Sequence, residues 1–323
     1  MTTALVFPGQ GSQTVGMGKA LADQFPAAAE VFARVDAALG EKLSKVIFEG
    51  SAAELTLTAN AQPALMATSL AVVRALESEA GLDVQRDAAF VAGHSLGEYS
   101  ALCAAGALAL EDSARLLRIR GRAMQRAVPV GEGAMAAILG LDFCEVSKIA
   151  AQAASDLYLT GAICEAANDN GGGQAVISGT KAAVERAMEL AKLKGAKRAL
   201  PLPVSAPFHC SLMRPAAEAM AEALAKAPIS APKVPLVANV SATPLVDPEA
   251  IRASLVAQVT GAVRWRESVL YMSARGVTRF VELGAGKALA GLIKRIADSA
   301  TVLSVGTPAD IAAFTAAAAN RGS

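Results

Sequence analysis

The chain carries the pentapeptide Gly93-His94-Ser95-Leu96-Gly97 directly after an apolar run, residues 88–92, and directly before a helix-like stretch, residues 98–107. A strand, a tight turn and a helix form the context in which a G-x-S-x-G sequence makes a nucleophile elbow. Glycines suit the flanks of so sharp a turn, because side chains have no room there, and the serine is forced into a strained, exposed conformation. The alternative is a glycine-flanked loop that contains a serine by chance. The neighbouring elements favour the elbow, and with it an α/β fold and a covalent acyl-enzyme.

The hydroxyl of Ser95 is expected at the N-terminus of the helix that follows it. Free backbone N–H groups and the positive end of the helix dipole favour negative charge at such a position. An oxyanion that forms beside Ser95 would therefore be stabilised. The backbone N–H of Leu96 is one candidate donor, and that of Gln10, in the glycine-rich turn at residues 8–13, is the second.

Length and composition limit the class of protein. The 323 residues suffice for about two ordinary domains, or for one large domain with an insertion. A net charge of +1 and 4% aromatic residues provide neither the basic excess nor the stacking surfaces of a nucleic-acid binder. No run approaches the ~18 apolar residues that span a bilayer, and the N-terminus lacks the pattern of a secretory signal. We expect a cytoplasmic protein with no nucleic-acid or membrane partner.

The sequence offers no recognisable site for a metal or a dinucleotide. Its cysteines, Cys103, Cys144, Cys164 and Cys210, have no C-x-x-C spacing, and the chain has only two histidines. The run at residues 9–16 has the spacing G-x-G-x-x-x-x-G, and no convincing acidic residue follows about twenty positions later. We expect no metal, no nicotinamide cofactor, and buried or free thiols.

Most of the chain alternates strands with helices, among them the helical stretches 64–79 and 111–127. Apolar runs expected as strands lie at residues 4–7, 88–92, 236–240, 279–283 and 301–305. Such alternation is typical of a mostly parallel sheet with helices on both faces. The alanine-rich stretch 311–320 is expected as a terminal surface helix.

A segment with a different order of elements interrupts this alternation. It is predicted as strand, helix, strand, strand, helix and strand, at residues 134–140, 143–154, 162–167, 174–179, 181–194 and 197–202. This β-α-β-β-α-β order is that of a ferredoxin-like domain. We predict a small domain at residues 129–203 inserted into a large domain of residues 1–128 and 204–323, with the substrate site in the cleft between them.

Ser95 requires a general base, and the only histidines are His94 and His209. Adjacent residues at such a turn point in different directions, so we expect His94 to pack against the loop. His209 lies in a loop after the last predicted strand of the small domain, facing the proposed cleft. A lone histidine can instead be a packing residue, but no other side chain here supplies a base of near-neutral pKa. No matching aspartate is evident, so a neutral carbonyl could accept the ring N–H.

The run Arg118-Ile119-Arg120-Gly121-Arg122, within the helical stretch 111–127, places three arginines close together. Exposure to solvent is the default for each of them. An arginine that faced the cleft would bind a substrate carboxylate through two parallel hydrogen bonds. The flanking pattern does not choose among the three.

Five segments in a fixed order carry a family resemblance. They are Phe-Pro-Gly-Gln-Gly-Ser-Gln at residues 7–13, Gly-His-Ser-Leu-Gly-Glu-Tyr-Ser-Ala at 93–101, Arg120-Gly121, Ser-Ala-Pro-Phe-His at 205–209, and Gln258 through Val-Arg-Trp at 263–265. Over essentially its whole length the chain resembles the malonyl-CoA:acyl carrier protein transacylases. The resemblance implies an α/β-hydrolase-like domain with a mostly parallel sheet and an inserted ferredoxin-like domain, in agreement with the predicted order of elements.

The resemblance also implies a ping-pong reaction. Ser95 would attack the thioester of malonyl-CoA, His209 would accept its proton, and the N–H groups of Gln10 and Leu96 would hold the oxyanion. Coenzyme A would leave, and the phosphopantetheine thiol of holo acyl carrier protein would attack the malonyl-serine ester, again with His209 as base. Coenzyme A is then a carrier of substrate and product, no cofactor is bound permanently, and the product supplies fatty acid synthesis.

Four further roles follow from the resemblance alone. Arg120 corresponds to the arginine that binds the malonyl carboxylate, and Gln258 to the residue whose backbone or side-chain carbonyl orients the histidine. Asn168 corresponds to an asparagine near the cleft. Phe208 resembles the bulky residue beside the base in malonyl-selective relatives.

Two other functions are compatible with parts of this pattern. An esterase or thioesterase would use the same nucleophile, base and oxyanion donors with water as acceptor. A carrier-protein-binding module without catalysis is the second, and the presence of both Ser95 and His209 argues against it.

Overall fold

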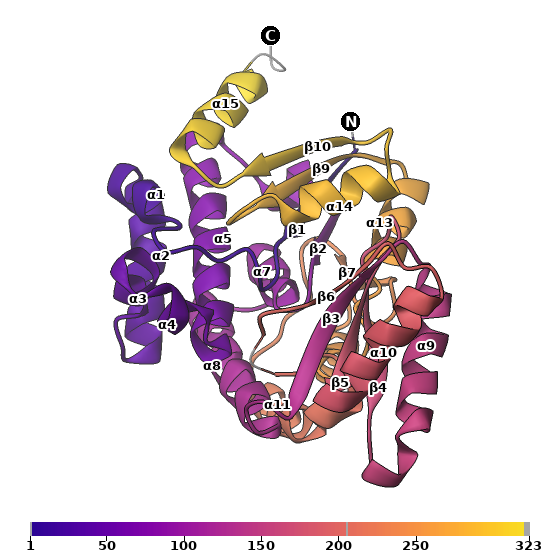
Figure 1. Ribbon diagram of the computed structural model, residues 1–323. Helices are drawn as coiled ribbons and strands as arrows, with labels where there is room; N and C mark the ends of the chain where they lie inside the picture. The colour runs from indigo at the N-terminus through magenta and orange to yellow at the C-terminus, as the bar shows by residue number, and fades with distance from the viewer. Residues whose placement is uncertain (1, 205, 320–323) are drawn as a thin grey trace.

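Two β-sheets organise the protein, whose computed structural model describes residues 2–204 and 206–319. Figure 1 shows the larger sheet beside helices from both ends of the chain, and the smaller sheet next to it. Ser205 of the segment 205–209 and Asn320 of the expected terminal helix lie outside the described residues.

The larger sheet has the strand order β10-β9-β1-β2-β7-β8. All its pairs are parallel except the last, between β7 and β8. Its strands are β1 (Thr2–Phe7), β2 (Phe90–Gly93), β7 (Leu236–Val237), β8 (Pro244–Leu245), β9 (Val277–Leu283) and β10 (Thr301–Val305). The expected mostly parallel sheet is confirmed.

Helices cover both faces of this sheet, and β1 shows why. Leu5 and Phe7 pack into the main core, while Ala4 and Val6 pack into a second core on the opposite face. A strand buried on both faces reads as a continuous apolar run. Figure 1 shows α5 and α8 on one side of the sheet and α13 and α14 on the other.

The helices before the small sheet are α1 (Lys19–Gln24), α2 (Pro26–Leu39), α3 (Leu43–Glu49), α4 (Ala52–Thr56), α5 (Thr58–Ala80), α6 (Val84–Asp87), α7 (Gly97–Ala104) and α8 (Leu110–Ala127). Those after it are the short η2 (Ser211–Met213), then α11 (Arg214–Lys226), α12 (Pro248–Gln258), α13 (Trp265–Ala274), α14 (Ala288–Ile296) and α15 (Pro308–Ala319).

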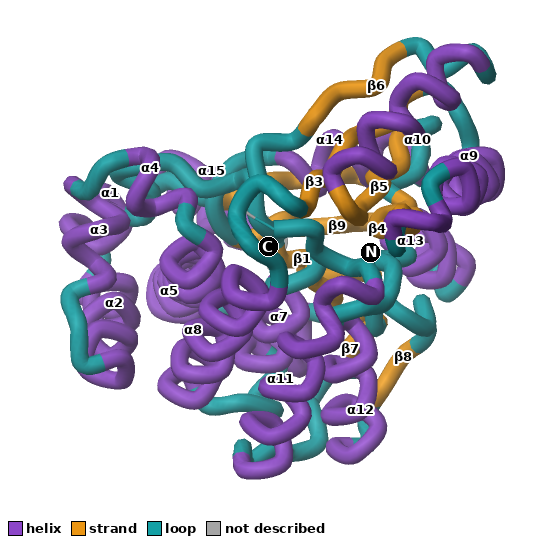
Figure 2. The backbone as a smooth tube through the Cα atoms, turned by 60° about the horizontal axis from the view of Figure 1, so that its bottom comes forward, coloured by secondary structure: helices purple, strands orange, loops and turns teal. Residues whose placement is uncertain are grey.

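The smaller sheet is antiparallel, with the strand order β4-β5-β3-β6. Its elements are β3 (Gly133–Leu139), α9 (Phe143–Asp156), η1 (Tyr158–Thr160), β4 (Cys164–Asp169), β5 (Gln174–Thr180), α10 (Lys181–Leu193) and β6 (Arg198–Pro201). Apolar side chains of α9 and α10 form a separate core with these strands. In Figure 2 the strands β3 to β6 and helices α9 and α10 lie together, apart from α2, α5 and α8. The expected ferredoxin-like order is confirmed.

Helix α5 begins earlier than predicted, at Thr58 rather than at residue 64. It contains Pro63, which lacks the N–H that would bond to the carbonyl of Ala59 one turn earlier. Nη1 of Arg118 donates to that carbonyl at 2.5 Å. A side chain from α8 therefore replaces the missing helical hydrogen bond, which no local pattern reveals.

Strand β7 ends at Val237, although residues 236–240 were expected as one strand. The chain turns after it, and the N–H of Ala238 donates to the carbonyl of Thr243 across the turn. The turn releases Asn239 from the sheet, and its side-chain amide bonds to the carbonyl of Gly93 at 2.7 Å. The shortened strand thus places a polar side chain against the elbow.

One segment joins the two sheets. The N–H of Val263 donates to the carbonyl of Ala167, and the N–H of Asp169 donates to the carbonyl of Val263, both at 2.9 Å. The carboxylate of Asp169, which is buried, also pairs with Nε of Arg266 at 2.8 Å. These contacts add the backbone near Val263 to the edge of β4.

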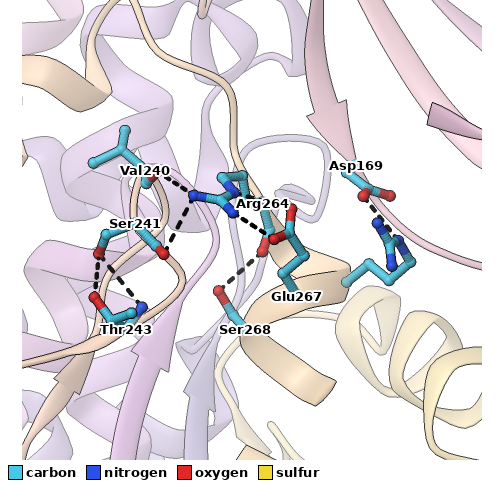
Figure 3. Close-up of polar contacts among 8 residues, drawn as sticks. Asp169, Val240, Ser241, Thr243, Arg264, Glu267 and Ser268 are labelled. Atoms are coloured by element: carbon cyan, nitrogen blue, oxygen red, sulfur yellow. Dashed lines mark hydrogen bonds and ion pairs between the residues drawn. The ribbon is translucent and has the colours of Figure 1, made fainter. Parts of the chain in front are cut away.

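Arg264 fixes the same segment to the turn after β7, as Figure 3 shows. Its Nη1 donates to the carbonyls of Val240 and Ser241 at 3.2 and 3.3 Å, and its Nη2 pairs with Glu267 at 2.5 Å. The small sheet and the turn that carries Asn239 are therefore held by one stretch of chain.

Candidate active site

Ser95 lies at the turn between β2 and α7 with φ of 54°, in the left-handed region that few non-glycine residues adopt. The flanking glycines make this turn possible. A Cβ at Gly97 would lie 2.3 Å from the carbonyl oxygen of Phe7, and one at Gly93 would lie 1.9 Å from the backbone of Gly97. The predicted elbow is therefore packed directly against β1.

We expect Gly97→Ala to destabilise the fold by about 3 kcal/mol or more, because the start of α7 and the backbone at the end of β1 would have to separate. Gly291→Ala is the matched control, since a Cβ at this helical position meets nothing within 4 Å; it should leave stability unchanged or raise it by about 1 kcal/mol. Urea unfolding measures both. Equal stability of the two variants would refute the packing argument.

The hydroxyl of Ser95 is hydrogen-bonded to His209, with 2.7 Å between Oγ and Nε2. On the other side of the ring, Nδ1 lies 2.9 Å from the carbonyl oxygen of Gln258 and 3.1 Å from that of Gly261. Carbonyls only accept, so Nδ1 carries the hydrogen and Nε2 is free to accept the Ser95 proton. Burial and then the charge of Arg120 lower the pKa of His209 to about 3, which keeps the imidazole neutral.

The guanidinium of Arg120 is buried beside the nucleophile. Its Nη1 donates to Oε1 of Gln62 at 2.8 Å, and its Nη2 donates to Oε1 of Gln258 at 2.8 Å and to Oγ of Ser95 at 3.1 Å. Among the described residues its Nε has no partner. Of Arg118, Arg120 and Arg122, Arg120 alone lines the cavity described next, because Arg118 bonds to Glu41, Asn60 and Ala59 and Arg122 is exposed.

A cavity of about 460 Å³ lies between the two sheets, with Ser95 and His209 in its wall. The small sheet contributes Met135 and Val176 to the opposite wall. The structure also brings Gln10, Leu96, Arg120, Asn168 and Phe208 to this cavity, as expected from the sequence. The side chain of Gln258 is fully buried behind it.

The N–H groups of Gln10 and Leu96 have no protein acceptor within residues 2–204 and 206–319. The N–H of Ser95, by contrast, donates to Oδ1 of Asn239 at 2.7 Å. The N–H groups of Gln10 and Leu96 therefore remain available as donors in the cavity wall near Ser95, whereas the N–H of Ser95 is already hydrogen-bonded.

His94 takes no part in this hydrogen bonding. Its Nε2 lies 3.0 Å from Oδ1 of Asn170, and its ring centroid lies 5.8 Å from that of Trp265. Burial lowers its pKa. It packs against the glycine-rich turn at Gly9, as expected, and also lines the cavity.

Sequence reasoning missed several polar residues around the site, among them Asn239, which bonds to the elbow, and Glu98, which bonds to Asn239. Oε1 of Glu98 accepts the N–H of Asn239 at 2.5 Å. Asn239 could have been noticed in the sequence, because it interrupts the apolar run at residues 236–240. Glu98 reads as an ordinary acidic residue in the first turn of a helix, so nothing local set it apart.

No three His, Cys, Asp or Glu side chains among the described residues come together as metal ligands. No described helix combines the length and the apolar character that crossing a bilayer requires.

The model of the acyl transferase domain family matches residues 4–312 of this chain. The chain belongs to this acyl transferase family. It is 48% identical over 308 residues to the malonyl CoA-acyl carrier protein transacylase of Bacillus subtilis, covering 95% of this chain and 94% of that protein. The corresponding Escherichia coli K12 protein is also 48% identical, over 96% and 97% of the two chains.

Solved acyl transferase structures resemble the whole molecule. The acyl-carrier-protein S-malonyltransferase of Bartonella henselae is 58% identical, with a TM-score of 0.94 over 99% of this chain and 100% of that one. A malonyl-transacylase in complex with a type II polyketide synthase acyl-carrier protein is 41% identical, with a TM-score of 0.93 over 98% and 100%.

Proposed function

We propose that this acyl transferase moves a malonyl group from malonyl-CoA to the phosphopantetheine thiol of holo acyl carrier protein. The observation that carries the proposal is a buried arginine beside an activated serine. Nη2 of Arg120 lies 3.1 Å from Oγ of Ser95, which in turn lies 2.7 Å from Nε2 of His209. A guanidinium at this place suits an acyl group that ends in a carboxylate. The names of the relatives support malonyl-CoA as the acyl donor and acyl carrier protein as the acyl acceptor.

In the first half-reaction Oγ of Ser95 forms a bond to the thioester carbon while Nε2 of His209 takes its proton. The carbonyl oxygen becomes an oxyanion, which the N–H groups of Gln10 and Leu96 stabilise. The C–S bond then breaks, and His209 returns the proton to the sulfur of coenzyme A. Coenzyme A is thus substrate and product carrier, and we propose no permanently bound cofactor.

In the second half-reaction the carrier-protein thiol repeats these steps in reverse. His209 takes the thiol proton, the sulfur attacks the malonyl-serine carbon, and the ester bond breaks as Ser95 regains its proton. The backbone carbonyls of Gln258 and Gly261 stabilise the imidazolium through Nδ1–H. In this proposal Gln258 orients the base through its backbone, while its side chain serves Arg120.

Intact-protein mass spectrometry tests the acceptor. After exposure to malonyl-CoA, we expect an adduct on Ser95 that persists in water and disappears rapidly when holo acyl carrier protein is added. The apo carrier protein, which lacks the thiol, is the control. Rapid loss of the adduct in water alone would instead identify a thioesterase.

We expect kcat/KM for malonyl-CoA to keep its full value to a pH well below 6.5. The ratio reports the free enzyme, in which the pKa of His209 is lowered to about 3 by burial and by Arg120, so the base stays neutral as the pH falls. The same depression makes the folded state lose stability as the pH drops from 6.5 toward 3, because the unfolded chain binds a proton first.

The Arg120→Met variant checks the cause of this depression. Without the neighbouring positive charge, the acid limb of its pH profile should move upward. An acid limb near 6.5 in the unmodified protein, or one that does not move in the variant, contradicts the assignment.

Phe208 and Asn168 are proposed to shape the acyl pocket. Both line the cavity, and Phe208 directly precedes the base. We expect Phe208→Ser to raise the ratio of methylmalonyl to malonyl transfer about tenfold or more, since an added methyl group is worth about 1 to 3 kcal/mol in such a pocket. Phe25→Ser, at a phenylalanine of equal burial outside the cavity, should leave the ratio unchanged. Equal ratios in both variants would exclude the steric role.

We further propose that residues 129–203 form an inserted domain and that residues 1–128 and 204–323 form the large one. All strands of the small sheet lie within 133–201 and share their own core, which supports this division. We also propose that the enzyme works in the cytoplasm and supplies fatty acid synthesis. Separate expression of the two domains tests the division. Malonyl transfer to a fatty-acid carrier protein tests the supply of fatty acid synthesis.

A further inference from the structure

A fully buried carboxyl group, that of Glu98, lies behind the cavity and does not line it. It comes from the first turn of α7, directly after the elbow. Within the described part of the chain it forms no ion pair at contact distance, and its closest partners are two N–H groups. Burying an acid without a counter-ion is costly. The reaction steps above give Glu98 no role that would explain this cost.

Both oxygens of Glu98 act as hydrogen-bond acceptors. Oε1 accepts the backbone N–H of Asn239 at 2.5 Å, and Oε2 accepts Nε2–H of Gln258 at 2.5 Å. Burial favours the neutral acid and raises the pKa of Glu98 to about 8, whereas these donors and the charge of Arg120 favour the carboxylate. Both oxygens thus face N–H donors, so each carboxyl oxygen serves as an acceptor toward its partner.

The side-chain amide of Gln258 has two ends with different tasks. Its Oε1 accepts Nη2–H of Arg120 at 2.8 Å, and its Nε2 donates to the carbonyl of Ser95 at 2.9 Å as well as to Glu98. If the amide were flipped, its NH₂ group would meet the guanidinium, donor against donor. Glu98 only accepts and therefore holds the NH₂ end on its own side.

The second partner of Glu98 holds the elbow itself. The side chain of Asn239 accepts the N–H of Ser95 at 2.7 Å and donates to the carbonyl of Gly93 at 2.7 Å. One amide thus spans both arms of the turn that keeps Ser95 in its left-handed conformation. Glu98 binds the backbone of this residue and the side chain of Gln258 at the same time.

We propose that Glu98 is a positioning residue that orients the Gln258 amide and, through it, aims the Arg120 guanidinium at the acyl carboxylate beside Ser95. The inference rests on the proposed function, in which that carboxylate belongs to malonyl. Glu98 touches no substrate, and its effect reaches the reaction through hydrogen bonds to groups that do. Its loss should therefore weaken selectivity for a carboxylate-bearing acyl group more than it weakens acyl transfer in general.

The test is Glu98→Gln, which keeps the shape and replaces one acceptor by a donor. That donor must face the N–H of Asn239 or the NH₂ of Gln258, so the amide loses its fixed orientation. We expect the ratio of kcat/KM for malonyl-CoA over acetyl-CoA to fall roughly 10- to 100-fold, mainly through a higher KM for malonyl-CoA. If Glu98 were merely structural, its replacement would lower kcat/KM for malonyl-CoA and for acetyl-CoA by the same factor. An unchanged ratio would therefore overturn the proposal.

Glu282→Gln is the matched control. Glu282 is equally buried and also accepts two N–H groups, those of Leu289 and Ala290, at the start of α14. Its replacement should lower stability without altering the ratio. A fall in the ratio of this variant equal to that of Glu98→Gln would also overturn the proposal.

A second variant covers the case in which Glu98→Gln does not fold. Gln258→Met removes the side-chain amide and keeps the backbone carbonyl that holds His209, so it should lower the same ratio by a similar factor; an unchanged ratio overturns the proposal. The double variant should lose no more selectivity than the larger single loss. The two proposals fail in different ways: no malonyl transfer by the unmodified protein refutes the function, whereas normal transfer by that protein with unchanged ratios in the variants refutes only the role of Glu98.

Discussion

Ser95→Ala is expected to lower malonyl transfer by roughly 10⁴- to 10⁶-fold and to abolish the covalent malonyl adduct. In the proposed reaction this hydroxyl carries the acyl group, and the described wall of the cavity contains no cysteine and no lysine that could replace it. His209→Ala should produce a loss of similar size, because the two groups act as one unit joined by a 2.7 Å hydrogen bond. The double variant should then be little worse than either single one.

Ser100→Ala is the matched control for this variant. Ser100 lies on α7 close to the nucleophile, is fully buried, and its Oγ has no hydrogen-bond partner among the described residues. Its loss should leave the rate of transfer and the adduct unchanged. Mass spectrometry together with steady-state rates decides the matter. An adduct on the Ser95→Ala protein would show that another residue carries the acyl group.

The sequence predicted the elements that depend on local patterns. The strand at residues 301–305 was predicted with its observed bounds, and the helix predicted at 111–127 begins one residue earlier, because apolar periodicity and flanking breakers mark these elements. Ser95 and His209 in the cavity wall were expected from short motifs with fixed chemistry, while Asn168 and Phe208 were expected from the family resemblance alone. Where alternatives remained open, as among Arg118, Arg120 and Arg122, the structure identified the one that faces the cavity.

What the sequence did not predict depends on contacts between distant segments. The early start of α5 requires Arg118 to satisfy the carbonyl of Ala59, and the early end of β7 requires Asn239 to turn toward Gly93. Of the two carbonyls that hold His209, that of Gln258 was implied by the family resemblance with backbone or side chain left open, and that of Gly261 was not predicted. Backbone acceptors leave no residue signature, so only the folded structure identifies them.

Arg120→Met is expected to lower kcat/KM for malonyl-CoA by roughly 30- to 5,000-fold, the equivalent of about 2 to 5 kcal/mol for one partner of a buried charged pair. Transfer from acetyl-CoA should fall much less, or rise, since acetyl leaves the native guanidinium without an anion. Methionine matches the length of the buried arginine stem and cannot bind a carboxylate. The variant should therefore convert a malonyl-selective site into one that no longer distinguishes the two thioesters.

Arg118→Met separates this effect from the general loss of a buried arginine. Arg118 lies on the same helix, is mostly buried, and bonds to Ala59, Asn60 and Glu41 instead of facing the cavity. Its replacement should lower the free energy of unfolding and keep the preference for malonyl-CoA over acetyl-CoA. If both variants lost selectivity equally, the preference would arise from the packing of α8. If only Arg120→Met lost it, one guanidinium, held by Gln62 and Gln258 beside the nucleophile, selects the diacid.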